Sequence, residues 1–253
     1  MSDFFPPADG GGDTVARPSA GRRAASRIGG FLRDVVIIVV AAVVISFLIK
    51  TFLIRSFYIP SQSMEETLRI NDRIIVNQLV PRFFPIERGD VVVFRDPGDW
   101  LEPIPVKETN NPIEAVWDGF LQVVGLSVSD SEQHLVKRVI GVGGDRVICC
   151  TDEGQITVNG VPLNEAPYIQ VPSSNHPASM QAFDVTVPEA SLWVMGDNRY
   201  ASADSRAHMD GPTMGFVRVD DVVGKALVIT WPTSRWGTVD SHYEVFDAVP
   251  DRR

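Results

Sequence analysis

Residues 135–160 read LVKRVIGVGGDRVICCTDEGQITVNG, and this stretch decides the fold class of the chain. It contains three short runs of apolar and β-branched residues, at Leu135–Ile140, Arg146–Cys150 and Ile156–Asn159. Asp152-Glu153-Gly154 and Asn159-Gly160 interrupt the runs with residues that tolerate a positive φ, as β-hairpin turns require. The pattern therefore predicts consecutive antiparallel strands.

The same kind of run recurs elsewhere, at Val91–Phe94, Leu192–Met195 and Ala226–Trp231. Many short strands separated by Gly, Pro, Asn and Asp are typical of an antiparallel sheet or barrel. We therefore expect residues 55–253 to form a mainly β domain, an antiparallel, barrel-like body with a few short helices. Residues 98–133, which are rich in Pro and Asn and flanked by strand patterns, are expected to be an insertion in this domain.

A different pattern precedes the β domain. Residues 35–49 contain no charged side chain, and residues 35–54 contain only Lys50, near their end. Since about 20 residues span the hydrocarbon core of a bilayer as a helix, we predict a transmembrane helix over residues 35–54. A buried core helix is the alternative, but such a helix usually carries a polar stripe, which this run lacks.

The residues around this run predict its orientation. Four arginines lie between residues 22 and 33, and such an excess places the N-terminus in the cytoplasm and residues 55–253 outside it. No small-x-small cleavage site follows the run, so we expect an uncleaved anchor rather than a signal peptide. Residues 1–34, rich in Gly, Pro, Ala and Ser, are expected to be a flexible tail.

Composition excludes some classes of function. The 253 residues are 44% hydrophobic and carry a net charge of −9, which makes nucleic acid a poor candidate for a partner. The two cysteines, Cys149 and Cys150, are adjacent, and we expect ordinary strand residues that point to opposite faces. The histidines show no metal-ligand spacing, so we predict neither a metal nor another cofactor.

Three segments carry side chains that could perform chemistry. Ser61 and Ser63 lie two residues apart just after the predicted membrane helix. Lys137 lies in an apolar strand pattern; if it faces inward, burial lowers its pKa and the neutral amine can accept a proton from a serine. Asp204 and Arg206 lie in a polar segment further on.

Each of these segments also has a plainer interpretation. The serines could belong to a polar loop that leaves the bilayer, the lysine could point into water, and the acidic and basic pair could be an exposed ion pair of little energetic value. A Ser-His-Asp site also stays open, because its members can lie far apart in the sequence.

Taken together and in order, these segments resemble the motifs of bacterial type I signal peptidases, membrane-bound serine proteases with a Ser-Lys dyad. The resemblance covers about residues 35–231, without the insertion. The matching motifs are the apolar run, Pro60-Ser61-x-Ser63-Met64 with Thr67-Leu68, Gly89-Asp90-Val91-Val92-Val93-Phe94, Lys137-Arg138-Val139-Ile140-Gly141-x-x-Gly144-Asp145, and Gly196-Asp197-Asn198-Arg199-x-x-Ser202-x-Asp204-Ser205-Arg206. The family often has Gly between the two serines and Pro two residues after the Met, where this chain has Gln62 and Glu66.

The resemblance implies roles for the matched residues. Ser63 is expected to be the nucleophile and Lys137 the general base. Ser61, together with the backbone N–H of Ser63, is expected to form the oxyanion hole, and Ser202 to orient the lysine. Further residues are expected to pair beneath the site (Asp204 and Arg206), to line the substrate pockets (Ile59, Met64, Leu68 and Val136), or to occupy structural positions (Asp90, Asp145, Asp197 and Arg138).

The implied function is that of a membrane-anchored serine endopeptidase that removes signal peptides from exported preproteins after small-x-small sites. Its partners would be preproteins and the lipid bilayer, and its location the cell membrane, with one span, a cytoplasmic N-terminus and an extracytoplasmic catalytic domain. Two alternatives stay open: a single-pass, β-rich binding or scaffold protein without catalysis, and a related Ser-Lys self-cleaving protease.

Overall fold

The computed structural model describes residues 33–47, 53–98, 100–101, 134–169, 173 and 175–251. The chain divides into two compact units, Met1–Phe47 and Leu48–Arg253, and each is described by itself. The predicted tail (1–34) and insertion (98–133) lie outside the described residues, apart from a few positions at their edges.

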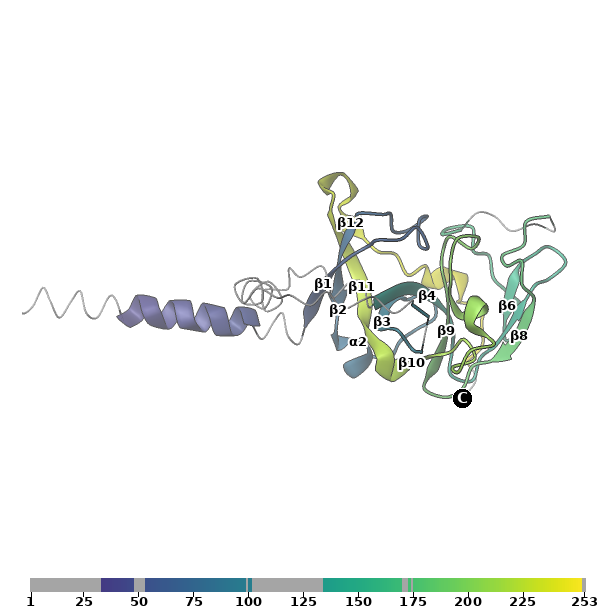
Figure 1. Cartoon of the computed structure of the whole chain (residues 1–253), viewed down its shortest axis with the longest axis horizontal. Helices are drawn as coiled ribbons and strands as arrows, with labels where there is room; N and C mark the ends of the chain where they lie inside the picture. Colours follow the sequence, from purple (N-terminus) through teal and green to yellow (C-terminus); the bar gives the residue numbers. More distant parts are fainter. Residues whose placement is uncertain are drawn as a thin grey trace, which may run out of the picture. The chain divides into compact units, whose positions relative to one another are not determined.

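The first unit contains a helix at residues 33–47, drawn in purple in Figure 1. All of its side chains are exposed, and large apolar ones such as Ile38 and Val43 are 67% and 62% exposed. Among the residues that the structure describes, no helix is long and apolar enough to cross a membrane. The predicted end of the membrane segment at residue 54 differs from the structure, because Ile54 begins a strand and pairs with Asn77.

The second unit is mainly antiparallel β-sheet, as predicted (Figure 1). Its larger sheet has eight strands in the order β1-β2-β11-β3-β4-β9-β10, with β12 paired to β11. These strands are β1 (Ile54–Tyr58), β2 (Arg73–Asn77), β3 (Val91–Arg95), β4 (His134–Val142), β9 (Ser191–Met195), β10 (Val217–Arg218), β11 (Val222–Trp231) and β12 (Gly237–Thr238). Four of the predicted runs therefore coincide with β3, β4, β9 and β11.

The smaller sheet has the strand order β7-β6-β5-β8. Its strands are β5 (Arg146–Cys149), β6 (Ile156–Val158), β7 (Val161–Pro162) and β8 (Phe183–Thr186). Gly154, between β5 and β6, has φ 81°, and Asn159 and Gly160, between β6 and β7, have φ 53° and 84°. Both hairpin turns predicted from the sequence are thus confirmed, because each uses the positive φ that its residues tolerate.

The helical elements of the second unit are short. They are α2 (Leu79–Arg82) and the 3₁₀ turns η1 (Ser205–His208), η2 (Val219–Asp221), η3 (Thr233–Arg235) and η4 (Tyr243–Val245). Buried apolar side chains form three clusters, one of which joins the residues after β1 to β2, β3 and β11. That cluster supports the segment that carries Ser61 and Ser63.

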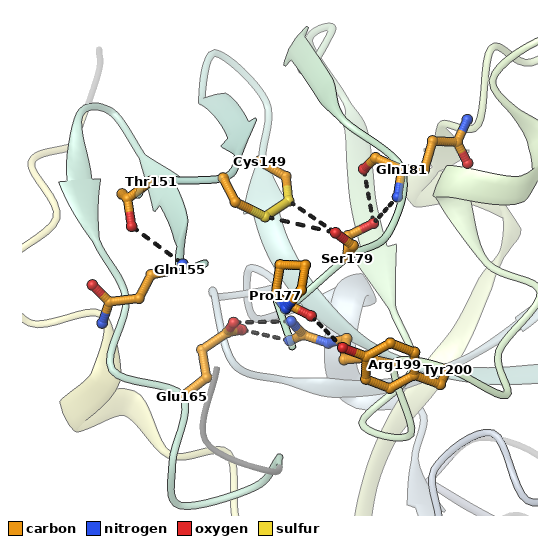
Figure 2. The surroundings of a disulfide bond; sticks show 10 residues. Cys149, Thr151, Gln155, Glu165, Pro177, Ser179, Gln181, Arg199 and Tyr200 are labelled. Atoms are coloured by element: carbon orange, nitrogen blue, oxygen red, sulfur yellow. Dashed lines mark hydrogen bonds and ion pairs between the residues drawn. A yellow bond between two sulfur atoms is a disulfide. The ribbon is translucent and has the colours of Figure 1, made fainter. Parts of the chain in front are cut away.

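The prediction for the two cysteines is wrong. Cys149 and Cys150 form a disulfide, and Figure 2 shows both sulfur atoms turned toward Ser179 O, which lies 3.7 and 3.9 Å away. The alternation of side chains that was expected to separate them holds only within a strand, and β5 ends at Cys149.

Candidate active site

Ser63 and Lys137, 74 positions apart in the chain, meet at the large sheet. Lys137 lies on β4, an interior strand of the sheet, and Ser63 lies in the turn after β1, where Leu68 N–H donates to Met64 O. Lys137 Nζ donates a hydrogen bond to Ser63 Oγ at 2.7 Å and another to Val136 O at 3.1 Å. The sheet thus places an amine and a hydroxyl in direct contact, the arrangement that activates a serine nucleophile.

The surroundings of Lys137 favour its neutral form. The side chain is almost completely buried, with the residue 3% exposed. This loss of water lowers the pKa of Lys137 to about 8, although the negative charges of Asp204 and Asp197 oppose the shift and the positive charge of Arg206 adds to it. A lysine with this pKa is partly unprotonated near neutral pH and can accept a proton there.

The two predicted serines lie side by side. Ser61 Oγ is 3.3 Å from Ser63 Oγ, and Ser61 is exposed while Ser63 is only 8% exposed. A hydroxyl can rotate to donate to a nearby oxygen. Ser61 can therefore donate to a negative oxygen that forms next to Ser63 Oγ.

Asp204 and Arg206 form the predicted pair. The Arg206 guanidinium donates two hydrogen bonds to the Asp204 carboxylate, at 2.8 and 2.7 Å. The backbone N–H of Arg206 donates a third at 3.2 Å, and Gly196 N–H donates a fourth at 2.9 Å. Burial raises the pKa of Asp204, but the hydrogen bonds and the charge of Arg206 outweigh it, so the pKa is lowered. Asp204 therefore stays ionised near Lys137 while most of its charge is balanced by Arg206.

Ser202 is near the site but does not bond to the lysine. Its Oγ makes no hydrogen bond of acceptable geometry within the described part of the chain, although it is close enough to Asp204 to help to lower that carboxyl's pKa. A side chain at Gly196 would collide with both Ser202 Oγ and Ser63 O. Glycine at this position lets the two serine segments approach, and the role predicted for Ser202 stays a prediction.

Asn198 holds the segment of Gln62 and Ser63 in place, a role that the sequence did not predict. Its backbone N–H donates to Ser63 O at 3.1 Å, and its side-chain amide donates to Gln62 O at 3.2 Å. Its place directly after Asp197 in a matched motif was the only sequence signal, because every residue type except proline can supply a backbone N–H.

Arg138 and Asp197 form a buried pair next to the site. Arg138 donates two hydrogen bonds to Asp197, both at 2.9 Å, and neither side chain is exposed. Further bonds from Arg138 reach Gly89 O at 2.8 Å and Thr67 Oγ1 at 3.2 Å, and Thr67 in turn donates to Asp197. These bonds join the turn after β1 to β4 and to the segment after β9.

The four predicted pocket residues gather in one place. Ile59, Met64 and Leu68 are buried in the cluster that joins β1 and β2 to β3 and β11, and Val136 packs against this cluster half-buried. Met64 directly follows Ser63, so this apolar cluster begins next to the serine.

Asp90 and Asp145 occupy structural positions in the fold. Asp90 accepts a hydrogen bond from Tyr243 OH at 2.7 Å and pairs with Lys225 at 2.6 Å. Asp145 accepts two hydrogen bonds from Arg88, both at 2.8 Å. Each carboxylate thus has a cationic partner.

Among the described residues, one further group could hold a metal ion. The carboxylates of Asp240 and Glu244 and the imidazole of His242 offer ligand atoms within 4.8 Å of one another, with both acids exposed. Exposed acidic groups of this kind are common without a metal. In the described part of the chain Lys137 bonds to Ser63 and Val136 and to none of these three residues, so we assign this group no part in the site.

Comparison with known proteins places these motifs in a family. Residues 32–231 match the family model described as Signal peptidase, peptidase S26. The chain is 42% identical to Signal peptidase I of Mycobacterium tuberculosis (strain ATCC 25618 / H37Rv) over 255 residues, which cover 94% of this chain and 85% of the relative. It is 40% identical to Probable signal peptidase I of Mycobacterium leprae, covering 83% and 80%, and 32% identical to Probable signal peptidase I-1 of Synechocystis sp., covering 88% and 92%. The chain therefore belongs to the signal peptidase family S26.

Proposed function

We propose that this chain is a membrane-anchored serine endopeptidase that removes signal peptides from exported preproteins, with Ser63 as nucleophile and Lys137 as general base. The observation that carries the proposal is the 2.7 Å hydrogen bond between Lys137 Nζ and Ser63 Oγ, formed by an amine whose burial lowers its pKa to about 8. Relatives named Signal peptidase I support the same activity.

Acylation follows from this geometry. The neutral amine of Lys137 takes the proton of Ser63 Oγ as that oxygen attacks the carbonyl carbon of the scissile bond. The carbonyl oxygen becomes negative and accepts hydrogen bonds from Ser63 N–H and Ser61 Oγ–H. When this intermediate collapses, the ammonium of Lys137 gives its proton to the leaving amine, and the signal peptide remains bound to Ser63 as an ester.

Deacylation reuses the same groups. Lys137, neutral again, takes a proton from a water molecule that attacks the ester carbonyl. The ester bond breaks, and Lys137 returns the proton to Ser63 Oγ. Ser202 would act as a positioning residue for the amine, with its hydroxyl beside Asp204.

Substrate choice follows from the apolar surface around the nucleophile. Ile59, Met64, Leu68 and Val136 would bound shallow pockets for the residues before the cut. A small side chain such as alanine fits a shallow pocket, while a larger one clashes, which accounts for cleavage after small-x-small sequences. The substrate would lie extended between the segment before Ser63 and the start of β4.

The membrane segment belongs to the same proposal. Residues 35–54 carry a single charge in the sequence, and the part described as a helix exposes apolar side chains all around. An anchor would hold the site at the membrane surface, where a tethered preprotein presents its cleavage site, and so raise the effective concentration. The arginines before the run favour a cytoplasmic N-terminus and an extracytoplasmic catalytic domain.

Two other functions are less well supported. A scaffold without catalysis predicts that Lys137 points into water far from Ser63, whereas it is 3% exposed and bonded to Ser63 Oγ. A self-cleaving protease would need a cleavage site of its own that can reach Ser63, and no described contact supplies one.

The test is cleavage of a preprotein by the detergent-solubilised full chain, with the cut mapped by mass spectrometry. We expect one cut after a small-x-small sequence, and a loss of at least about 10³-fold for Ser63→Ala. Ser191→Ala is the matched control, because Ser191 on β9 is also 8% exposed and lies outside the site. Cleavage by Ser63→Ala at the rate of the unmodified protein would refute the proposal.

A further inference from the structure

A cavity of about 540 Å³ lies against the nucleophile segment, and the mechanism above makes no use of it. Its lining includes Glu66, His176, Asn198 and Tyr200. Asn198 bonds directly to Ser63 O and Gln62 O, and Glu66 follows Ser63 by three positions in the same turn. The cavity therefore begins next to the residue that would hold the scissile bond.

The cavity is separate from the apolar pockets proposed for the signal peptide. None of Ile59, Met64, Leu68 and Val136 lines it. An extended chain advances about 3.3 Å per residue, so a substrate that occupies those pockets before the cut reaches a neighbouring cavity within a few residues after the cut.

The charge of the cavity is set by Glu66. Two other charged residues of its lining are compensated, because Asp197 is paired with Arg138 and Arg199 donates to Glu165 at 2.9 Å. Glu66 is exposed, and none of the residues that the structure describes forms a hydrogen bond or ion pair with it. The cavity thus offers an unbalanced negative charge to a ligand.

Another part of the lining is aromatic and held in place. Tyr200 is 54% exposed, and its hydroxyl donates to Pro177 O at 2.8 Å, as Figure 2 shows. Ala178 N–H donates to Gly154 O at 2.8 Å, and the Cys149–Cys150 disulfide touches Ser179 O. A fixed aromatic ring and an unpaired carboxylate that line the same cavity suit a cation, which gains from both.

From this arrangement we infer that the cavity is the subsite for the first residues of the mature protein, and that it prefers a lysine or arginine side chain there. The inference rests on the proposed function, in which the apolar pockets bind the residues before the cut and no site has yet been assigned to the residues after it. Glu66 and Tyr200 would then be specificity-determining residues for the mature side of the preprotein.

The test uses one preprotein in which each of the first four mature positions is changed in turn to Lys, Gln or Glu. For the full-length enzyme we expect kcat/KM at one or two of these positions to be about three- to tenfold higher for Lys than for Glu, the size of a partly exposed charge interaction. Glu66→Gln should bring this ratio close to one, and Glu66→Lys should reverse it.

Glu65→Gln is the matched control, since Glu65 is the exposed neighbour in the same turn and does not line the cavity. It should leave the ratio of Lys to Glu unchanged. A ratio near one at all four positions in the unmodified enzyme, or equal changes in Glu65→Gln and Glu66→Gln, would overturn the inference while leaving cleavage itself intact. Failure to cut any substrate would instead overturn the proposed function, and the inference with it.

Discussion

Two neighbouring residues of β4 both have basic side chains, but the pKa of one is lowered and the pKa of the other is raised. Lys137 and Arg138 are adjacent and both buried, at 3% and 0% exposed. Successive side chains of a strand point to opposite faces, so each meets its own surroundings. On one face, burial lowers the pKa of Lys137 to about 8. On the other, burial alone would lower the pKa of Arg138, but the charge and hydrogen bonds of Asp197 raise it.

The difference lies in the partners and not in the depth of burial. Arg138 has a carboxylate of its own, while among the described residues Lys137 is bonded only to a hydroxyl and a carbonyl oxygen. The two carboxylates that influence Lys137 are already engaged, Asp197 by Arg138 and Asp204 by Arg206. A fully paired cation supports structure, whereas a buried cation without an ion pair tends to give up its proton and can act as a base.

The largest effect should come from giving position 137 a side chain that stays positively charged, as Arg138 does on the other face of β4. In Lys137→Arg the guanidinium cannot lose its proton near neutral pH, so Ser63 loses its base. We expect kcat for preprotein cleavage to fall by about 10²- to 10⁴-fold. Lys225→Arg, the same change at a residue paired with Asp90, should keep most of the activity. If the activity of Lys137→Arg stays within a few-fold of the unmodified enzyme, position 137 does not need a side chain that can lose its proton, and the difference drawn between Lys137 and Arg138 is wrong.

The second prediction compares stability on the two faces. Arg138→Met leaves Asp197 buried without its partner and should lower the free energy of unfolding by about 3–5 kcal/mol. Lys137→Met should raise it at pH 7 by about 1–3 kcal/mol, because folding then no longer disfavours an ammonium group. Urea unfolding in one detergent, followed by tryptophan fluorescence, measures both changes.

The sign of the Lys137→Met effect depends on pH. The pKa of Lys137 is lowered from 10.5 to about 8 on folding, so the folded state binds fewer protons than the unfolded state between these values. The increase in the free energy of unfolding caused by Lys137→Met should be complete below about pH 8 and should disappear as the pH rises toward 10.5. Changes of the same sign in both variants would show that the two faces do not differ as described.

The smallest effect is the pH profile itself. In the proposed mechanism only neutral Lys137 accepts the serine proton, so kcat/KM should fall about tenfold per pH unit below the lysine's pKa of about 8. Arg206→Gln should move this limb to higher pH, because the positive charge of Arg206 lowers the pKa of Lys137 and Asp204 would lose its partner. A rate that stays constant between pH 6 and pH 8 would exclude Lys137 as the titrating base.

Much of the fold follows from local patterns. The turns at Asp152–Gly154 and Asn159-Gly160 depend on residues that tolerate positive φ, and the runs they separate became β5 and β6. The cysteine pair escaped prediction for an equally local reason, since the strand ends between the two residues and the alternation ends with it. The predicted end of the membrane helix at residue 54 was also wrong. Ile54 begins β1, which pairs with β2, and an apolar side chain suits such a strand as well as a membrane helix.

The site was predictable only through resemblance. No pattern in the sequence links Ser63 to Lys137, and the matched motifs supplied that link. Even the motifs did not reveal Asn198, which acts largely through a backbone N–H that every residue but proline possesses. The cavity beside Glu66 and Tyr200 is likewise built from segments whose proximity no local pattern encodes.

The sequence by itself determined the β-rich class, the hairpin turns, the apolar N-terminal run and the set of motif residues, because periodicity and turn chemistry act between near neighbours. Tertiary structure alone decided that Lys137 is buried against Ser63 while Arg138 is paired with Asp197. A pKa depends on solvent and on charges brought near by the fold, and the same lysine on an exposed strand would remain an ordinary ammonium group.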